Sequence, residues 1–220
     1  MLDLPKRDET PILPGVRAAK QSRSIRIRDA YLQAGIKLLN EVRFNDLKVS
    51  SLAEHCGYSV GSFYTRFDDK DAFFRALRFA VITSCDEIID ARVSPQHLER
   101  MTPEEASDEL VDLLADIFSG PYRGVLRESL LRILEPDDPW APMRDSARRI
   151  IRYYHQSLSN RLPQSDKVEA RAQLSFAFQI VVGVLQNDLV NDYHIYSTRD
   201  RSIRTALKDN LRKQLSLRPA

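Results

Sequence analysis

The sequence predicts an all-α fold on the basis of three observations. Only 7 of the 220 residues are glycine, and the alternation of apolar and polar residues that marks a half-buried strand is rare. Apolar residues instead recur three and four positions apart along most of the chain, which is the period of an amphipathic helix. A chain of this length can bury a core in one large domain or in two smaller ones.

The first helix is expected directly after an irregular N-terminal segment. Residues 1–21 contain three prolines and mixed charge without any period, so we expect a disordered arm. From there on, Ile27, Tyr31 and Ala34 recur at helical spacing. Residues 22–40 are therefore predicted to form a helix.

Two short helices follow, separated by a glycine turn. Residues 49–56 have an apolar face two turns long, and Gly57 then breaks the helix. Ser59 is placed to cap the next short helix, in which Phe63 and Phe67 point to one side. This arrangement is a helix-turn-helix, whose first helix crosses the DNA backbone and whose second helix lies in the major groove.

The second short helix also carries side chains suited to DNA. Its small residues permit close approach, Ser62 and Thr65 can reach base edges, and Tyr64 can donate to a phosphate. Residues 17–48 hold eight basic residues against three acidic ones. Lys70 lies in the first turn of the following helix, where a cation opposes the helix dipole and a phosphate contact would explain it. The predicted DNA-binding residues are Lys48, Ser59, Val60, Gly61, Ser62, Tyr64, Thr65, Arg66 and Lys70.

The rest of the chain is expected to form a second helical domain, with residues 22–68 as the DNA-binding domain and residues 69–220 as the second one. A long helix capped by Asp68 or Asp69 connects the two and ends near residue 92. Thr102, followed by proline and two acids, is a strong helix start. Further helices are expected at 102–119, 122–134, 140–161, 165–192 and 198–215.

The apolar run at residues 176–185 predicts a dimer. Its β-branched residues would suit a buried strand, but helical neighbours on both sides favour a helix that is apolar on more than one side. Such a helix needs two surfaces to bury against, its own core and, most simply, a second copy of the chain in a two-fold dimer. The predicted interface residues are Val182, Leu185 and Leu189. A central core helix of a monomer is the alternative that stays open.

One stretch carries a fixed order of residue types, at Phe44, Val49, Leu52, Ala53, Cys56, Gly57, Tyr58, Ser59, Gly61, Ser62, Phe63, Tyr64, Phe67, Lys70 and Phe73. This order and its spacing resemble the helix-turn-helix motif of the TetR family of bacterial transcriptional regulators. Two positions depart from the family pattern, because Lys48 replaces a capping Thr and Arg43 replaces Gly. A lysine has no oxygen with which to cap a helix.

The resemblance implies a repressor that binds an inverted-repeat operator in double-stranded DNA as a homodimer. In the family the second domain usually holds an apolar cavity for a small effector, here expected to be apolar or aromatic, and filling it shifts the long connecting helix. The candidate ligand-binding residues are Phe118, Tyr122, Trp140, Met143, Tyr154 and Phe178. Ordinary core packing is the alternative for each of them.

Other functions have weaker support. The sequence at 57–61 spells G-x-S-x-G, the nucleophile elbow of α/β-hydrolases, but that motif needs a strand before Ser59, where a helix is predicted. The four histidines are scattered and no phosphate-binding loop is present, so no enzyme activity, metal or cofactor is expected. A helical interaction module with a purely structural helix-turn-helix stays open.

The cysteines and the N-terminus indicate a cytoplasmic protein. Cys56 and Cys85 fall at apolar helix positions without C-x-x-C spacing, so no disulfide framework is expected. The N-terminus lacks an apolar signal-peptide core, and no apolar run approaches the roughly 18 residues of a membrane span.

Overall fold

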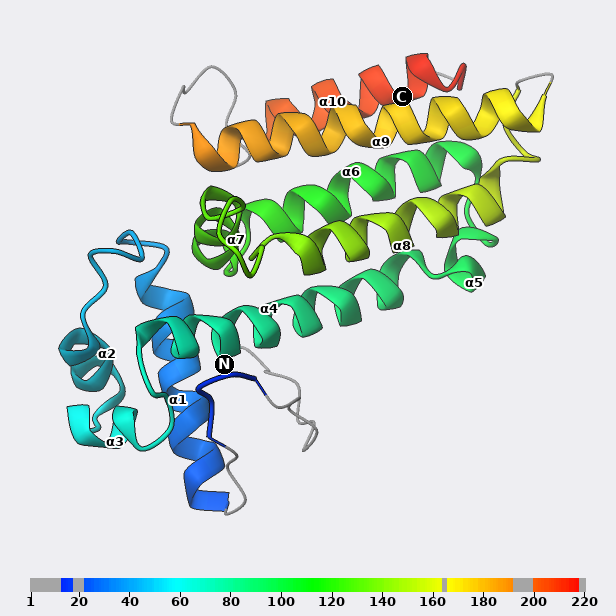
Figure 1. Ribbon diagram of the computed structural model, residues 1–220. Coiled ribbons are helices and arrows are strands. Elements are labelled where there is room, and N and C mark those ends of the chain that lie inside the picture. The colour runs from blue at the N-terminus through cyan, green and yellow to red at the C-terminus, as the bar shows by residue number, and fades with distance from the viewer. Residues whose placement is uncertain (1–12, 18–21, 164–165, 192–199, 218–220) are drawn as a thin grey trace. The chain divides into compact units, whose positions relative to one another are not determined.

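The structure is a computed structural model, and it describes residues 13–17, 22–163, 166–191 and 200–217. Helices are the only repeated secondary structure in these ranges, which confirms the predicted all-α class (Figure 1). They are α1 (Ser22–Leu38), α2 (Val49–Cys56), α3 (Val60–Tyr64), α4 (Lys70–Val93), α5 (Pro95–Leu98), α6 (Pro103–Ser119), α7 (Arg123–Leu131), α8 (Ala141–Leu158), α9 (Lys167–Val190) and α10 (Arg201–Gln214).

The chain divides into two compact units, and the division differs from the predicted domain boundary. Unit 1 comprises Met1–Ser84 and Pro121–Trp140, and unit 2 comprises Cys85–Gly120 and Ala141–Ala220. The boundary therefore lies inside α4, and α7 joins the helix-turn-helix unit. Local periodicity could not predict this, because the reason is a set of contacts between segments far apart in the sequence.

Helix α7 is fixed to the end of α1 by polar contacts. The Gly124 N–H donates to Asn40 Oδ1 at 2.8 Å, and Arg127 Nη2 donates to the Leu39 carbonyl at 2.9 Å. A Cβ on Gly124 would lie 2.2 Å from that same Leu39 oxygen, so only glycine permits this approach. Arg127 also pairs with the buried carboxylate of Glu128 at 3.0 Å.

The core of unit 1 is an aromatic cluster. The ring of Phe63 lies 5.5 Å from that of Tyr31, 5.1 Å from that of Phe67 and 5.5 Å from that of Phe73. All four side chains are fully buried. Tilted and edge-to-face pairs at these distances are favourable geometries for aromatic rings. The cluster joins α1, α3 and the start of α4 around one point, and this fixes the helix-turn-helix.

Unit 2 is built around α6, which packs against α9 and α10. Its start has the predicted cap, because Thr102 Oγ1 accepts from the Glu105 N–H and the Glu105 carboxylate accepts from the Thr102 N–H. Three acids spaced four residues apart on α6 face three bases spaced four apart on α10. The pairs are Asp108 with Arg212, Asp112 with Lys208 and Asp116 with Arg204.

Helix α9 is apolar on two sides, as predicted, but the two sides are not the ones expected. Leu185 and Leu189 lie on the buried side, with 0% and 2% of their surface exposed, and Val182 is half-buried. Leu185 and Leu189 therefore pack into the core of their own chain, and of the predicted interface residues only Val182 keeps exposed surface for a partner. The exposed side instead carries Phe176 and Val184.

The same helix corrects the expectation about membrane spans. By length and composition α9 is apolar enough to cross a membrane, and 28% of its most apolar window is buried. A single helix of this kind is weak evidence for a membrane span, because core helices of soluble proteins pass the same test. Its low burial reflects the apolar side that faces away from unit 2.

Candidate nucleic-acid interface

The glycine turn between α2 and α3 forms as the sequence predicts. Gly57 adopts the left-handed conformation with φ of 72°, and its N–H reaches the last carbonyls of α2. Lys48 occupies the N-cap position of α2 without a side-chain cap bond, as its replacement of a threonine implies. Because α2 ends in a left-handed residue, the chain turns away from the α2 axis within three residues and starts α3.

Ser59 caps α3, as predicted. Its Oγ accepts from the Ser62 N–H at 3.2 Å, and its own backbone is extended. The element before it is helix α2, so the strand-to-helix turn of a nucleophile elbow is not found at this serine. The hydroxyl therefore has a structural explanation in the helix-turn-helix.

The hydroxyl of Ser62 is directed into the protein by a contact that the sequence did not reveal. Tyr31 from α1 places its hydroxyl 2.8 Å from the Ser59 carbonyl and 2.7 Å from Ser62 Oγ. Ser62 Oγ in turn donates to the Ser59 carbonyl at 2.8 Å. Burial raises the pKa of Tyr31, so this phenol stays neutral and able to donate. The Ser62 hydroxyl is thus already bonded within the fold, and its contact with base edges stays a prediction.

Thr65 and Arg66 close the C-terminal end of α3. Thr65 Oγ1 donates to the Ser62 carbonyl at 2.7 Å, and Arg66 Nη1 donates to the same carbonyl at 2.6 Å and to Thr65 Oγ1 at 2.8 Å. These groups satisfy a helix end that has lost its intrahelical partners. Both residues were predicted to contact DNA, and in this structure their polar atoms hold the helix.

Besides Ser59 and Thr65, whose hydroxyls bond within the fold, five exposed residues lie on or next to the helix-turn-helix at α3, and we call them the α3 face. They are Lys48, Tyr58, Val60, Gly61 and Tyr64. Tyr58 was missed from the sequence, where it stood in the turn and outside the pattern of the helix. The signal that could have found it is an aromatic residue off the buried stripe of Phe63 and Phe67.

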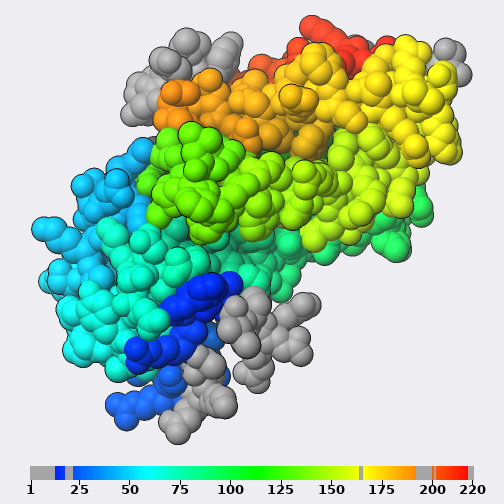
Figure 2. Space-filling view, in the orientation of Figure 1, coloured from blue at the N-terminus to red at the C-terminus, as the bar shows by residue number. Residues whose placement is uncertain are grey.

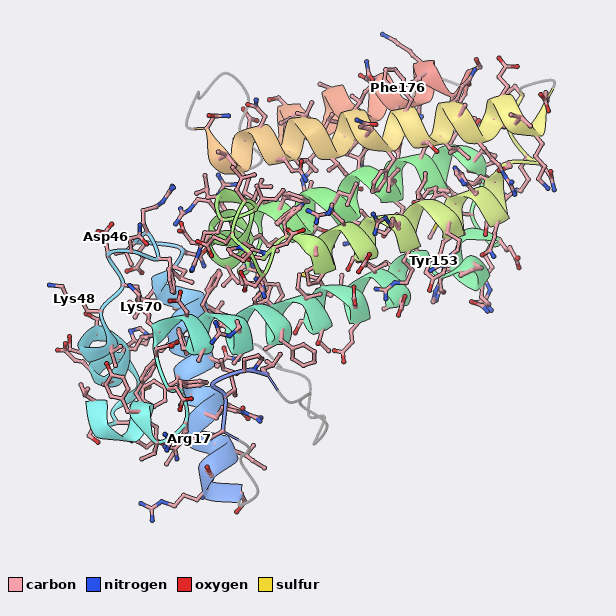
Figure 3. The ribbon with its side chains drawn as sticks, in the orientation of Figure 1. Arg17, Asp46, Lys48, Lys70, Tyr153 and Phe176 are labelled. Atoms are coloured by element: carbon pink, nitrogen blue, oxygen red, sulfur yellow. The ribbon has the colours of Figure 1, made fainter. Side chains whose placement is uncertain are left out.

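Lys70 has a role within the fold, and this role offers a different explanation from the predicted phosphate contact. Lys70 is the first residue of α4 (Figure 3). Its Nζ donates to the carbonyls of Phe44, Asn45 and Leu47 at 2.9, 3.2 and 3.2 Å, and it lies 4.6 Å from the centre of the Phe44 ring. An ammonium group has three protons, and three carbonyls surround this one. The contacts explain a cation in the first turn of α4 without invoking DNA.

Replacing Lys70 with Met should therefore destabilise the helix-turn-helix rather than remove a DNA charge contact. We expect the free energy of unfolding to fall by about 1 to 3 kcal/mol, because three carbonyls lose a charged donor. The salt dependence of DNA binding should not change. Urea unfolding and binding isotherms at several salt concentrations measure the two quantities. If the variant instead lowered the salt slope by about one unit and left the stability unchanged, Lys70 would be a phosphate contact.

The six predicted ligand residues divide between the two units. Tyr122 and Trp140 belong to unit 1 and the other four belong to unit 2. All except Phe178 are buried, and the Tyr154 hydroxyl donates to the Ala106 carbonyl at 2.8 Å. A cavity of about 190 Å³ in unit 1 is lined by none of them. Its lining residues are Asp71, Phe74, Arg75, Arg132, Glu135, Asp137 and Pro139.

Comparisons with known proteins agree with this geometry. Residues 32–77 match the family model of bacterial regulatory proteins of the tetR family. No curated protein matches the sequence. Among solved structures, a TetR-family regulator from Mesorhizobium loti is similar at 14% identity and a TM-score of 0.66, covering 89% of this chain and 96% of that one. Salmonella enterica GusR is similar at 16% identity and a TM-score of 0.58, covering 90% of this chain and 100% of that one. FadR from Bacillus halodurans is similar at 16% identity and a TM-score of 0.55, covering 88% of this chain and 96% of that one.

The fold and the α2–α3 geometry define a helix-turn-helix protein with a second all-helical unit. The helix-turn-helix at residues 32–77 is that of the bacterial regulatory proteins of the tetR family, which confirms the resemblance seen in the sequence.

Proposed function

We propose that this protein is a sequence-specific DNA-binding transcriptional repressor, and not an enzyme. It acts in the cytoplasm as a homodimer on an inverted-repeat operator, and a small, largely apolar or aromatic effector releases it. The observation that carries the proposal is the α3 face, which combines a lysine, two tyrosines, a valine and a glycine. Hydrogen bonds from Tyr31 and Arg66 to Ser62 hold α3 in place on its buried side.

Gly61 supports the assignment of α3 to the major groove. The nearest atom to a Cβ built at this position is Ser59 Oγ at 3.8 Å, so the fold has room for a side chain. Glycine inside a helix costs up to about 1 kcal/mol relative to alanine. The fold gives no reason for a glycine at position 61, whereas a close approach of α3 to DNA would require one.

The DNA proposal is tested with a duplex that carries the upstream region of the gene encoding this chain. Lys48→Ala should weaken binding to every sequence and lower the salt slope by about one unit, since one phosphate contact is lost. Lys167→Ala, the matched loss of charge in unit 2, should leave the slope unchanged. Wild-type protein without any salt-dependent binding would instead favour the interaction module with a structural helix-turn-helix.

The exposed side of α9 supports the dimer. Phe176 is 60% exposed and Val184 is 38% exposed, and half-buried Ile180 lies between them on the same side. A Cβ on Gly183 would meet no atom within 4 Å, so nothing within this chain requires a glycine there. A close crossing by the same helix of a second copy explains both features. Two copies on two half-sites then predict a spacing of about 34 to 36 Å, or a multiple.

Two buried hydroxyls support an effector site in unit 2. Ser107 on α6 and Ser157 on α8 are buried, and their Oγ atoms have no hydrogen-bond partner among the described residues. Buried polar groups of this kind call for a water molecule or a ligand atom. The proposed lining therefore combines these serines with Phe118, Met143, Tyr154 and Phe178.

Straight-chain fatty acids of 8 to about 16 carbons and benzoate are the first effector probes, because they pair an apolar body with one polar end. An effector should weaken DNA binding by about 5- to 150-fold, and DNA should weaken effector binding by the same factor. Ser107→Ala should reduce effector affinity without loss of stability. Titrations by calorimetry, with and without operator DNA, measure both factors. If the affinity for the effector were the same with and without operator DNA, the result would contradict the proposal.

A further inference from the structure

The N-terminal segment at residues 13–17, which we call the strap, lies on the turn between α3 and α4. This corrects the prediction of a disordered arm for these five residues. Val16 forms an isolated antiparallel bridge with Phe67. The Arg17 N–H donates to the Arg66 carbonyl at 2.9 Å, and the Asp68 N–H donates to the Gly15 carbonyl at 2.9 Å. Figure 2 shows the strap in dark blue across the surface of the neighbouring cyan segment.

Side-chain contacts and backbone geometry make this docking specific. Arg17 forms an ion pair with Asp68 at 3.2 Å, and Arg75 Nε donates to the Pro14 carbonyl at 3.1 Å. Gly15 has φ of 74°, and a Cβ there would lie 2.8 Å from the Cβ of Ala72. Both the left-handed backbone and the close approach to α4 require glycine at this position.

The strap acts on the residue that closes α3. The carbonyl of Arg66 accepts from the strap, while the guanidinium of Arg66 holds the Ser62 carbonyl and Thr65 Oγ1. Helix α3 has five residues, too few to be stable without tertiary contacts. Its N-terminal end is held by the Ser59 cap and the Tyr31 hydroxyl. Its C-terminal end is held by Arg66, and Arg66 is in turn held by the strap through the Arg17 N–H.

We propose that the strap is a positioning element for DNA recognition, which fixes the C-terminal end of α3 so that the α3 face meets base edges in one orientation. The inference rests on the proposed DNA-binding function. Loss of the strap should therefore reduce discrimination between sequences, while phosphate contacts made elsewhere preserve general affinity. A role for Arg17 as a direct DNA contact is the competing explanation, since its guanidinium is largely exposed.

Two substitutions at Arg17 separate these explanations in the full-length protein. Arg17→Pro and Arg17→Ala both remove the guanidinium, but only proline also removes the N–H that bonds to the Arg66 carbonyl. The probes are the upstream duplex and a shuffled duplex of equal length and composition. Arg17→Pro should lower the ratio of the two affinities by about 10-fold or more, the size of one mismatched base pair, and Arg17→Ala by about 3-fold or less. Equal loss in both variants, or an unchanged ratio in Arg17→Pro, would overturn the proposal.

Hydrogen exchange tests the strap without any DNA. In Gly15→Val, which cannot dock without strain, the amides of residues 62–68 should exchange about 10-fold faster than in the wild type, since their helix end opens locally. Pro14→Ala is the matched control, because it keeps the carbonyl that Arg75 uses, and its exchange should equal that of the wild type. Unchanged protection of these amides in Gly15→Val would refute the positioning role even if DNA binding is intact. If the faster exchange is seen but the wild type shows no preference for the upstream duplex, the proposed function is wrong. The conclusion that the strap fixes the C-terminal end of α3 is then still supported.

Discussion

Replacing Phe176 with Glu should convert the proposed dimer into a folded monomer. Phe176 is 60% exposed on α9, so the single chain tolerates a carboxylate there. In a two-fold interface the substitution buries two unpaired charges, one from each copy. Each such charge costs about 3 to 5 kcal/mol, so the two together should raise the dissociation constant by a factor of about 10,000 or more. Sedimentation at micromolar concentration measures the change in mass.

Two further variants show whether the effect belongs to the interface. Leu134→Glu introduces the same charge at a position that is 95% exposed outside α9, and it should leave the dimer intact. Leu185→Glu introduces it on the opposite side of α9, at a fully buried position, and should unfold unit 2 rather than release monomers. A wild-type monomer at micromolar concentration, or a Phe176→Glu dimer of unchanged affinity, would rule out this face.

Replacing Gly61 with Leu should abolish specific DNA binding while leaving the fold intact. The fold has open space at this position, and leucine is a better helix former than glycine, so the melting temperature should stay equal or rise. In the complex, four additional carbon atoms would hold α3 away from the base edges. We expect a loss of about 100-fold or more on the upstream duplex, equivalent to about 3 kcal/mol, because several base contacts are lost together.

Gly61→Ala provides a graded control for this prediction. One methyl group should produce a smaller loss of affinity for the upstream duplex. The affinity for a shuffled duplex should change little in either variant, because other residues contact the phosphates. A leucine variant with full affinity would place Gly61 outside the DNA interface. A lowered melting temperature would show that the loss comes from the fold.

The sequence by itself determined the features that depend on contacts within about one helical turn. Ser59 was identified as a cap because its partner, the Ser62 N–H, lies three residues away. Thr102 was identified as a cap for the same reason, and Gly57 was identified as the helix end because its role depends only on its own backbone angle. Together with helical periodicity, these local signals were enough for the all-α class and the helix-turn-helix.

The tertiary structure alone decided which partner each remaining polar group has. Lys70 meets carbonyls 23 to 26 residues away, and Tyr31 meets Ser62 across 31 residues, so no local pattern separates these groups from DNA contacts. Periodicity likewise shows that α9 has two apolar sides but not which one its own core covers. The packing of α6, α8 and α10 against α9 made that choice, because it buries Leu185 and leaves Phe176 exposed.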